Sequence, residues 1–141
     1  MNEAEARARM AGARVARLAT GGGGGPLIVP ICFALDGDTV YSVVDDKPKR
    51  TRSLRRLAEV RSDPLVAVLA DHWSEDWSEL WWVRADGRAR VLEPESRQDA
   101  AERERAVTLL RDRYSQYATH ALDGPVLAVV VTAWRWWSAF G

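Results

Sequence analysis

The sequence is poor in the residues that carry most catalytic and metal chemistry, with one cysteine and two histidines among 141 residues. A single cysteine excludes an internal disulfide, and the apolar run around Cys32 predicts a buried thiol in a protein of a reducing cytoplasm. His120 has no serine or carboxylate at a suggestive spacing, so a hydrolytic triad has no support. The formal net charge is zero, and no overall field therefore draws the chain to a nucleic acid or an anionic membrane.

Long apolar runs are also missing. The longest, residues 126–133, is interrupted only by Thr132 and is far shorter than the roughly 20 residues of a membrane-spanning helix. The first fourteen residues alternate acids and arginines among alanines, which predicts a short helix rather than a signal peptide. Hydrophobic residues make up 47% and charged residues 28%, values typical of a globular protein. We expect a single cytoplasmic domain over residues 1–141 that contacts neither membrane nor nucleic acid.

The hydrophobic pattern is mainly that of strands. Expected strands cover residues 13–20, 26–35, 39–44, 65–71, 80–92 and about 126–137, and expected helices cover residues 3–12, about 54–60 and 95–113. Residues 80–92 are expected as two strand segments around Asp86 and Gly87 or as one long strand bent there. The run Gly21–Gly25 predicts a hairpin turn, and Asp36 to Asp38 predicts a second one. Pro30 cannot donate a ladder hydrogen bond, which predicts an edge, a bulge or an approaching ligand at this point of its strand. Six or so mostly antiparallel strands with two or three connecting helices indicate an α+β, mainly β, closed or half-closed barrel.

Positive charge is concentrated in one stretch, DDKPKRTRSLRRL (45–57), which holds six cations and both lysines of the chain. Thr51 or Ser53 is expected to cap the helix that follows, so Lys49, Arg50 and Arg52 stand at its amino end. Cations are unfavourable there unless an anion binds, and a phosphate would meet free backbone N–H groups together with these charges. The alternative is a solvated basic surface with an Arg55–Glu59 pair one turn apart. A nucleic-acid patch is less favoured because no aromatics interleave with the cations.

Two other features carry weaker signals. The segment DHWSEDWSE (71–79) gathers acids and a histidine, but no framework brings three of them together, and we expect no metal there. Seven tryptophans lie in two clusters, residues 73–82 and 134–137. Large amphipathic rings are favoured in cores and at subunit interfaces, and we expect most of them there.

Several segments taken together resemble the pyridoxamine 5′-phosphate oxidase-like split β-barrel family. They are ARLAT, VPICFALDGDTVYSVVDDKPKRTRSLRRL, PLVAVLADHWSEDWSELWWVRADGRARVL and GPVLAVVVTAWRWWSA. More narrowly, they are similar to its branch of oxidoreductases that use the deazaflavin coenzyme F420. The resemblance implies an FMN-binding-like split barrel and a homodimer that holds a flavin or deazaflavin in a groove between its subunits. It also assigns cofactor-binding roles: the phosphate to Lys47, Lys49, Arg50, Thr51 and Arg52, the strand leading to it to Ser42 and Val43, and ring contacts to Val29 and Pro30, with Trp82 and Trp137 as candidate ring walls.

The hypothesis that follows is a homodimeric oxidoreductase that transfers a hydride between coenzyme F420 and a small, flat, unsaturated acceptor. No catalytic acid, base or nucleophile is expected, because the cofactor carries the difficult chemistry. Three alternatives stay open: FMN in the same groove, a carrier that binds the cofactor without turnover, and a cofactor-free barrel used for protein contacts. Pyridoxamine phosphate oxidase activity itself is not expected, since the chain stops soon after WRWW and lacks the extension that completes that substrate pocket.

Overall fold

The structure, a computed structural model, describes residues 1–44 and 50–141, and the side chains of residues 50–54 lie outside this description. The helices are α1 (Glu3–Gly12), α2 (Arg50–Ser62) and α3 (Ala100–Arg113), with the 3₁₀ turns η2 (Trp77–Glu79) and η3 (Ser115–Thr119). The strands are β1 (Ala16–Thr20), β2 (Leu27–Ile31), β3 (Ala34–Asp36), β4 (Thr39–Val43), β5 (Leu65–His72), β6 (Trp81–Leu92) and β7 (Val126–Ser138). None of the described helices has the length and apolarity to cross a membrane.

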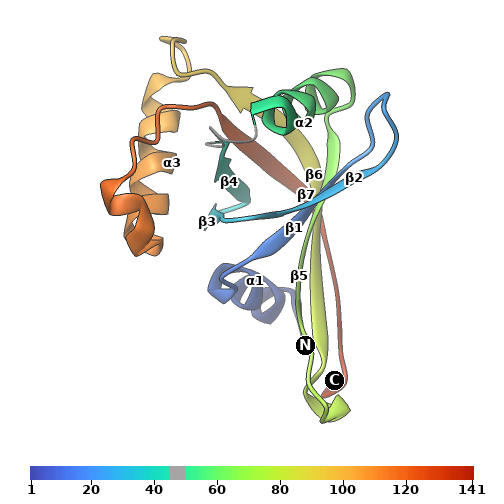
Figure 1. The fold of residues 1–141 in the computed structure, drawn as a ribbon. Helices are drawn as coiled ribbons and strands as arrows, with labels where there is room; N and C mark the ends of the chain where they lie inside the picture. Colours follow the sequence, from blue (N-terminus) through green and yellow to red (C-terminus); the bar gives the residue numbers. More distant parts are fainter. Residues whose placement is uncertain (45–49) are drawn as a thin grey trace.

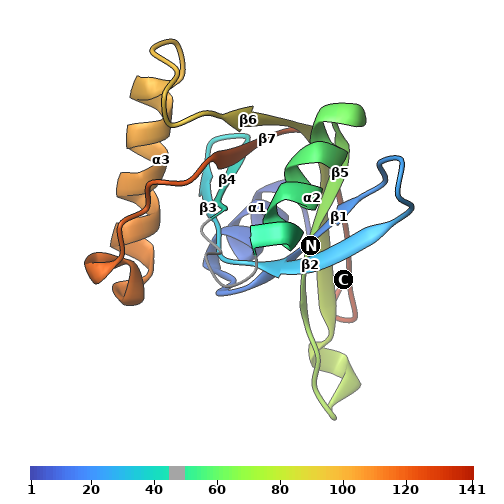
Figure 2. The same ribbon diagram turned by 45° about the horizontal axis from the view of Figure 1, so that its top comes forward.

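The strands form one curled antiparallel sheet of seven strands in the order β2-β1-β5-β6-β7-β4-β3. β2 and β3 are consecutive in the chain but lie at opposite edges of the sheet, so the two residues between them connect its edges and close half a barrel (Figure 1). The predicted split β-barrel of class α+β is confirmed, with seven strands where six or so were expected. β5 and β6 continue past the barrel as a hairpin that projects beyond the rest of the chain (Figures 1 and 2).

The expected strand over residues 26–35 is wrong in one respect, because it is interrupted at Cys32 and Phe33. The Tyr114 hydroxyl accepts a hydrogen bond from the Phe33 N–H at 3.0 Å and lies 3.1 Å from the Phe33 carbonyl oxygen. The Tyr114 side chain thus supplies the hydrogen-bond partner that the backbone of a neighbouring strand would otherwise provide. Ser42 donates to the Cys32 carbonyl at 2.8 Å. The Cys32 thiol is exposed and not buried as predicted, because the chain turns between two edges at this point.

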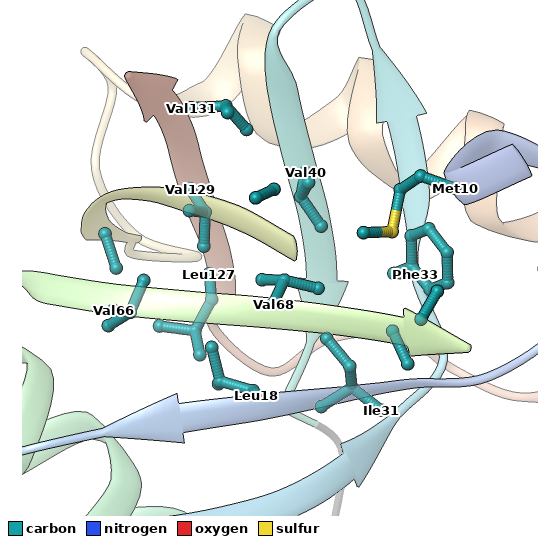
Figure 3. Packing of buried hydrophobic residues seen from close by; sticks show 14 of the residues in the cluster. Met10, Leu18, Ile31, Phe33, Val40, Val66, Val68, Leu127, Val129 and Val131 are labelled. Atoms are coloured by element: carbon teal, nitrogen blue, oxygen red, sulfur yellow. The ribbon is translucent and has the colours of Figure 1, made fainter. Parts of the chain in front are cut away.

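The barrel interior is filled by one apolar cluster to which α1 contributes Ala6 and Met10 (Figure 3). Asn2 and Glu5 form a capping box that begins α1. Arg7 pairs with Asp38, which fixes α1 to the β3–β4 turn. A second cluster lies on the outer side of the sheet, where α3 packs on β3, β4 and the adjoining ends of β6 and β7. Figure 2 shows α3 at the side of β3 and β4.

α2 is joined to the β1–β2 hairpin by a buried carboxylate. Glu59 is 5% exposed and accepts from the Thr20 hydroxyl at 2.7 Å and from Arg55 at 3.1 Å, the pair that the solvated-surface alternative named. The Thr20 hydroxyl, followed by Arg55, holds the pKa of Glu59 below its ordinary value. α2 begins at Arg50, so Thr51 and Ser53 lie inside the helix and neither is the cap residue that was predicted. The first turn of α2 contains no acidic residue.

Candidate functional site

A cavity walled by tryptophans opens at the projecting end of the sheet. Trp82 of β6 and Trp137 of β7 are directly paired across the strands, and Asp71 of β5 is paired with Trp82 on its other side. Because alternate residues of a strand share a face, these side chains stand on the outer face of the sheet. The cavity has a volume of about 440 Å³. It is lined by residues from β5, β6, β7 and the β5–β6 turn: Leu69, Asp71, His72, Trp73, Leu80, Trp81, Trp82, Arg84 and Trp137.

The charged groups of this cavity are held in pairs. Arg84 donates to both carboxylate oxygens of Asp86, at 2.7 and 3.0 Å, and this contact raises the pKa of the Arg84 guanidinium. Arg17 of β1 pairs with Asp71 at 3.1 Å. Neither carboxylate is placed as a general base in a buried setting, since Asp71 is exposed, Asp86 is half-buried, and each is engaged by an arginine. The cavity therefore offers ring surface for stacking together with two ion pairs.

The β5–β6 turn is fixed by its own side chains. Asp76 caps η2 by accepting from the Ser78 N–H at 3.0 Å and from the Ser78 hydroxyl at 2.6 Å, and these bonds, the hydroxyl first, lower the pKa of Asp76. Ser74 donates to Glu79 at 3.0 Å. Although this segment is acidic, no group of three or more possible metal ligands occurs among the residues that the structure describes. The turn instead presents Trp73 and Trp77, which are 62% and 71% exposed.

A second, more polar cavity of about 400 Å³ lies on the other face of the hairpin, between α1, the turn and the chain end. The Arg9 guanidinium lies 5.3 Å from the ring centre of Trp81 and 4.6 Å from that of Phe140. His72 stacks on Trp81 with ring centres 6.3 Å apart. The two Arg9 contacts attach α1 to the turn end of the hairpin and to the chain beyond β7.

The predicted anion site falls largely outside the described part of the chain. Lys47 and Lys49 lie in the segment 45–49, which is not described, and Arg50, Thr51 and Arg52 are placed only by their backbone, in the first turn of α2. Ser42 and Val43 lie on β4, which leads to this segment, and both are buried. The Ser42 hydroxyl is engaged by the Cys32 carbonyl.

The two residues predicted beside the cofactor ring point to different faces of β2. Val29 is half-buried and packs against the barrel core, whereas Pro30 is exposed. Pro30 is paired with Arg17, and Arg17 with Leu69 of the cavity wall, so Pro30 shares the outer face with the tryptophans. The structure thus groups Pro30, Trp82 and Trp137 on one face and leaves Val29 in the core.

The predicted ring walls lie far from the end of β4, the strand that leads into the predicted phosphate segment. Val43 pairs with Val126 at the start of β7, and Trp137 stands eleven residues farther along the same strand. At about 3.3 Å per residue this is roughly 36 Å of strand. A single copy of the chain therefore cannot bring the tryptophan cavity to the strand end that leads into the basic segment.

Sequence reasoning did not find Leu69, Asp71 or Arg84 as neighbours of the tryptophan pair. The sequence signal for Arg84 was the two-residue alternation of β6, which places Arg84 on the same face as Trp82. The strand pairing that adds Leu69 and Asp71 depends on register, which alternation in one strand does not determine.

The family comparison bears on this geometry. The family model described as pyridoxamine 5′-phosphate oxidase matches residues 2–133. The chain belongs to the pyridoxamine 5′-phosphate oxidase family. The match includes β1 to β6 and most of β7, and therefore the face that carries Trp82. No protein of curated function matches the sequence.

Solved structures share the fold of this pyridoxamine 5′-phosphate oxidase family member. An FAD-binding protein from Mesorhizobium loti is 21% identical, with 96% of this chain and 94% of that chain covered and a TM-score of 0.72. An FAD-binding protein from Mycobacterium smegmatis is 18% identical, with coverages of 98% and 96% and a TM-score of 0.61. A heme-binding protein from Mycobacterium smegmatis is 24% identical, with coverages of 97% and 54% and a TM-score of 0.66. At these identities the likeness concerns the fold.

Proposed function

We propose that the protein is an oxidoreductase that uses coenzyme F420, with its tricyclic ring held against Trp82 and Trp137. The observation that carries the proposal is the pair of tryptophans walling an open cavity of about 440 Å³, a size suited to a small planar ring system. Membership of the pyridoxamine 5′-phosphate oxidase family and the fold shared with FAD-binding proteins support a flavin-type ligand. A bound deazaflavin would supply hydride transfer.

The chain's own part is to bind, orient and exclude water. Trp82 and Trp137 would contact the ring faces, and Arg84, already fixed by Asp86, would stand at the cavity edge. The basic residues Lys47, Lys49, Arg50 and Arg52 remain the proposed phosphate contacts. Because Val126, the β7 partner of Val43, and Trp137 are about 36 Å apart along β7 in one copy, the proposal takes the ring walls and the phosphate contacts from different copies of a homodimer.

Titration with F420 and FMN tests this proposal. We expect binding of F420 to quench tryptophan fluorescence and to weaken by at least tenfold in Trp82→Ala, since aromatic stacking is lost. Trp77→Ala is the matched control, because Trp77 lies in the adjoining β5–β6 turn, is exposed and is not part of the cavity lining. Binding should also weaken as salt rises, as a phosphate held by cations requires. FMN binding without F420 binding would favour the flavin alternative, and no binding of either would overturn the proposal.

A carrier is the second candidate, and it is favoured because Asp71, the carboxylate among the described residues that line the cavity, is engaged by Arg17. Oxidation of reduced F420 in the presence of quinone or enone acceptors separates the two functions. An acceptor-dependent rate supports the enzyme, whereas binding without such a rate supports the carrier.

A further inference from the structure

The second cavity, of about 400 Å³, lies where the barrel core ends and the inner face of the projecting hairpin continues. Its lining comes from α1, β5, η2, β6 and the residues after β7, namely Arg9, His72, Ser78, Glu79, Trp81 and Phe140. The Ala139 N–H donates to the Leu80 carbonyl at 2.9 Å, which fixes the chain beyond β7 against the hairpin (Figure 1). The proposed function uses the first cavity and leaves this one without a role.

Arg9 is a half-buried arginine whose N–H donors meet no oxygen of the described chain. Arg7 and Arg103 are half-buried too, and each donates to a carboxylate or a backbone carbonyl. Arg9 instead lies over two rings, 5.3 Å from the centre of Trp81 and 4.6 Å from that of Phe140. A ring face attracts the charge of a guanidinium but leaves its N–H groups without an oxygen acceptor. Water or a bound oxyanion therefore has to supply these acceptors.

His72 adds a second donor beside the same tryptophan. It is paired with Trp81 across β5 and β6, and its ring stacks on the Trp81 ring with centres 6.3 Å apart. No described residue forms a hydrogen bond with either ring nitrogen of His72. A neutral imidazole carries one N–H donor. Arg9 and His72 thus both present unused donors at the wall of the second cavity.

The acidic wall of the cavity limits the charge of a ligand. Glu79 of η2 accepts from the Ser74 hydroxyl at 3.0 Å and has no cationic partner among the residues that the structure describes. The Ser78 hydroxyl is used by Asp76 at 2.6 Å. One unpaired arginine and one unpaired carboxylate suit a ligand of a single negative charge better than a dianion such as phosphate. A cationic ligand is disfavoured because Arg9 already occupies the ring faces that would receive it.

We propose that the second cavity is a binding site for a small monocarboxylate with an apolar body. The Arg9 guanidinium takes the carboxylate oxygens, because a planar pair of N–H donors matches a carboxylate. His72 adds a donor, and the ring of Phe140, which is 48% exposed, contacts the apolar part of the ligand. This inference concerns another cavity and another ligand class than the proposed function, and it does not rest on that function.

Titration with benzoate, followed by calorimetry and by saturation-transfer NMR, tests this site. We expect benzoate to bind saturably and the neutral analogue benzamide to bind at least tenfold more weakly, because the charge-assisted hydrogen bonds are lost. Arg9→Gln should weaken benzoate binding at least tenfold, and Arg9→Lys should weaken it less, since lysine keeps the charge without the planar pair of donors. Arg97→Gln is the matched control, because Arg97 is exposed and lies in the connection between β6 and α3.

Glu79→Gln tests the same site without touching Arg9. Removing the negative charge from the cavity wall should strengthen benzoate binding about two- to fivefold. A variant that merely loosened α1 or the hairpin would weaken binding instead, and circular dichroism of each variant shows whether it is folded. Weaker binding of benzoate by a folded Glu79→Gln would therefore contradict the proposed charge arrangement.

The remaining outcomes distinguish the two cavities. Trp82→Ala should leave benzoate binding unchanged, because Trp82 lines the first cavity and not the second. Loss of benzoate binding in Trp82→Ala but not in Arg9→Gln would place benzoate in the first cavity and overturn the inference. Absence of benzoate binding, or equal binding of benzamide, would also overturn it and would show that water supplies the acceptors of Arg9. These results leave the F420 titration of the first cavity as a separate test.

Discussion

Replacing Gly22 by alanine should destabilise the protein, although the same change one residue later should not. Gly22 is buried beneath α2, and a Cβ atom added there would lie 2.8 Å from Cα and Cβ of Glu59 and 2.9 Å from its carbonyl oxygen. These atoms belong mainly to the backbone of a helix, so they cannot rotate away. The β1–β2 hairpin and α2 must therefore separate to admit one methyl group.

The size of the effect follows from overpacking. Forcing an extra methyl group into a packed site costs about 1–3 kcal/mol. A chain of this length has an entropy of unfolding of about 0.3 kcal/mol/K, so the Tm of Gly22→Ala should fall by about 3–10 °C. Gly23→Ala is the matched control, because a Cβ at Gly23 meets nothing within 4 Å. Its Tm should stay the same or rise slightly, since alanine lowers the entropy of the unfolded chain.

Thermal unfolding followed by circular dichroism measures both variants under the same conditions, with urea unfolding as an independent check. Equal Tm values for Gly22→Ala and Gly23→Ala would refute the reasoning, because they would show that α2 does not rest on the hairpin at Gly22. A loss confined to Gly22→Ala would show that one glycine of the five is needed for close packing and that the run is not merely a loose turn.

Three further predictions concern stability. Gly87→Ala should lower the urea midpoint at least as much as Gly22→Ala, because a Cβ there would lie 2.4 Å from the Val130 carbonyl oxygen at the β6–β7 register shift; an unchanged midpoint would contradict that contact. Tyr114→Phe should cost about 1–3 kcal/mol of unfolding free energy, since it leaves the Phe33 N–H buried without its acceptor, and a loss below about 0.5 kcal/mol would show that water replaces the hydroxyl. The pKa of Glu59 is lower in the folded state, so its contribution is present above the ordinary carboxyl pKa and is lost as pH falls through the folded value. The Tm of the wild type should therefore fall more steeply below about pH 5 than that of Glu59→Gln, and parallel curves would count against the buried pair.

The parts of the fold that could be predicted from sequence are those set by local pattern. Even-numbered residues of β6 lie on the outer face and odd-numbered residues in the core, as the alternation from Val83 to Ala89 indicates. The bend expected at Asp86 and Gly87 is present as a shift in register between β6 and β7. These features depend on neighbours within one strand, so one strand is enough to indicate them.

The interruption at Cys32 and Phe33 could not be predicted in the same way. It depends on Tyr114, a residue 81 positions away, whose hydroxyl satisfies the Phe33 backbone. A β-branched run predicts an extended chain but does not indicate which partner completes its hydrogen bonds. The exposure of Cys32 is a consequence of that distant contact, and the prediction of a buried thiol failed for this reason.

In the candidate site, too, local features could be predicted from the sequence and features that depend on distant pairing could not. Tryptophan at 82 and at 137 was visible in the sequence, but their pairing requires a register that is set across the whole length of β6 and β7, and a slip by one residue would turn one ring into the core. The cation-rich segment was also visible. Whether Lys47 and Lys49 hold an anion stays a prediction, because they lie outside the described residues.

The composition of the cavity limits what kind of selectivity it can have under the proposed function. Its rings contribute stacking, and its arginine, Arg84, is already engaged by Asp86, so few polar groups are available to read a particular substituent. A site that hydrogen-bonds its ligand rejects an analogue lacking the partner group strongly, whereas an apolar wall separates similar shapes only weakly. Selection by Trp82 and Trp137 therefore depends on the flatness and the area of the ligand's ring. Finer discrimination between ligands has to come from the residues that the partner subunit of the proposed dimer places on the open side of the cavity.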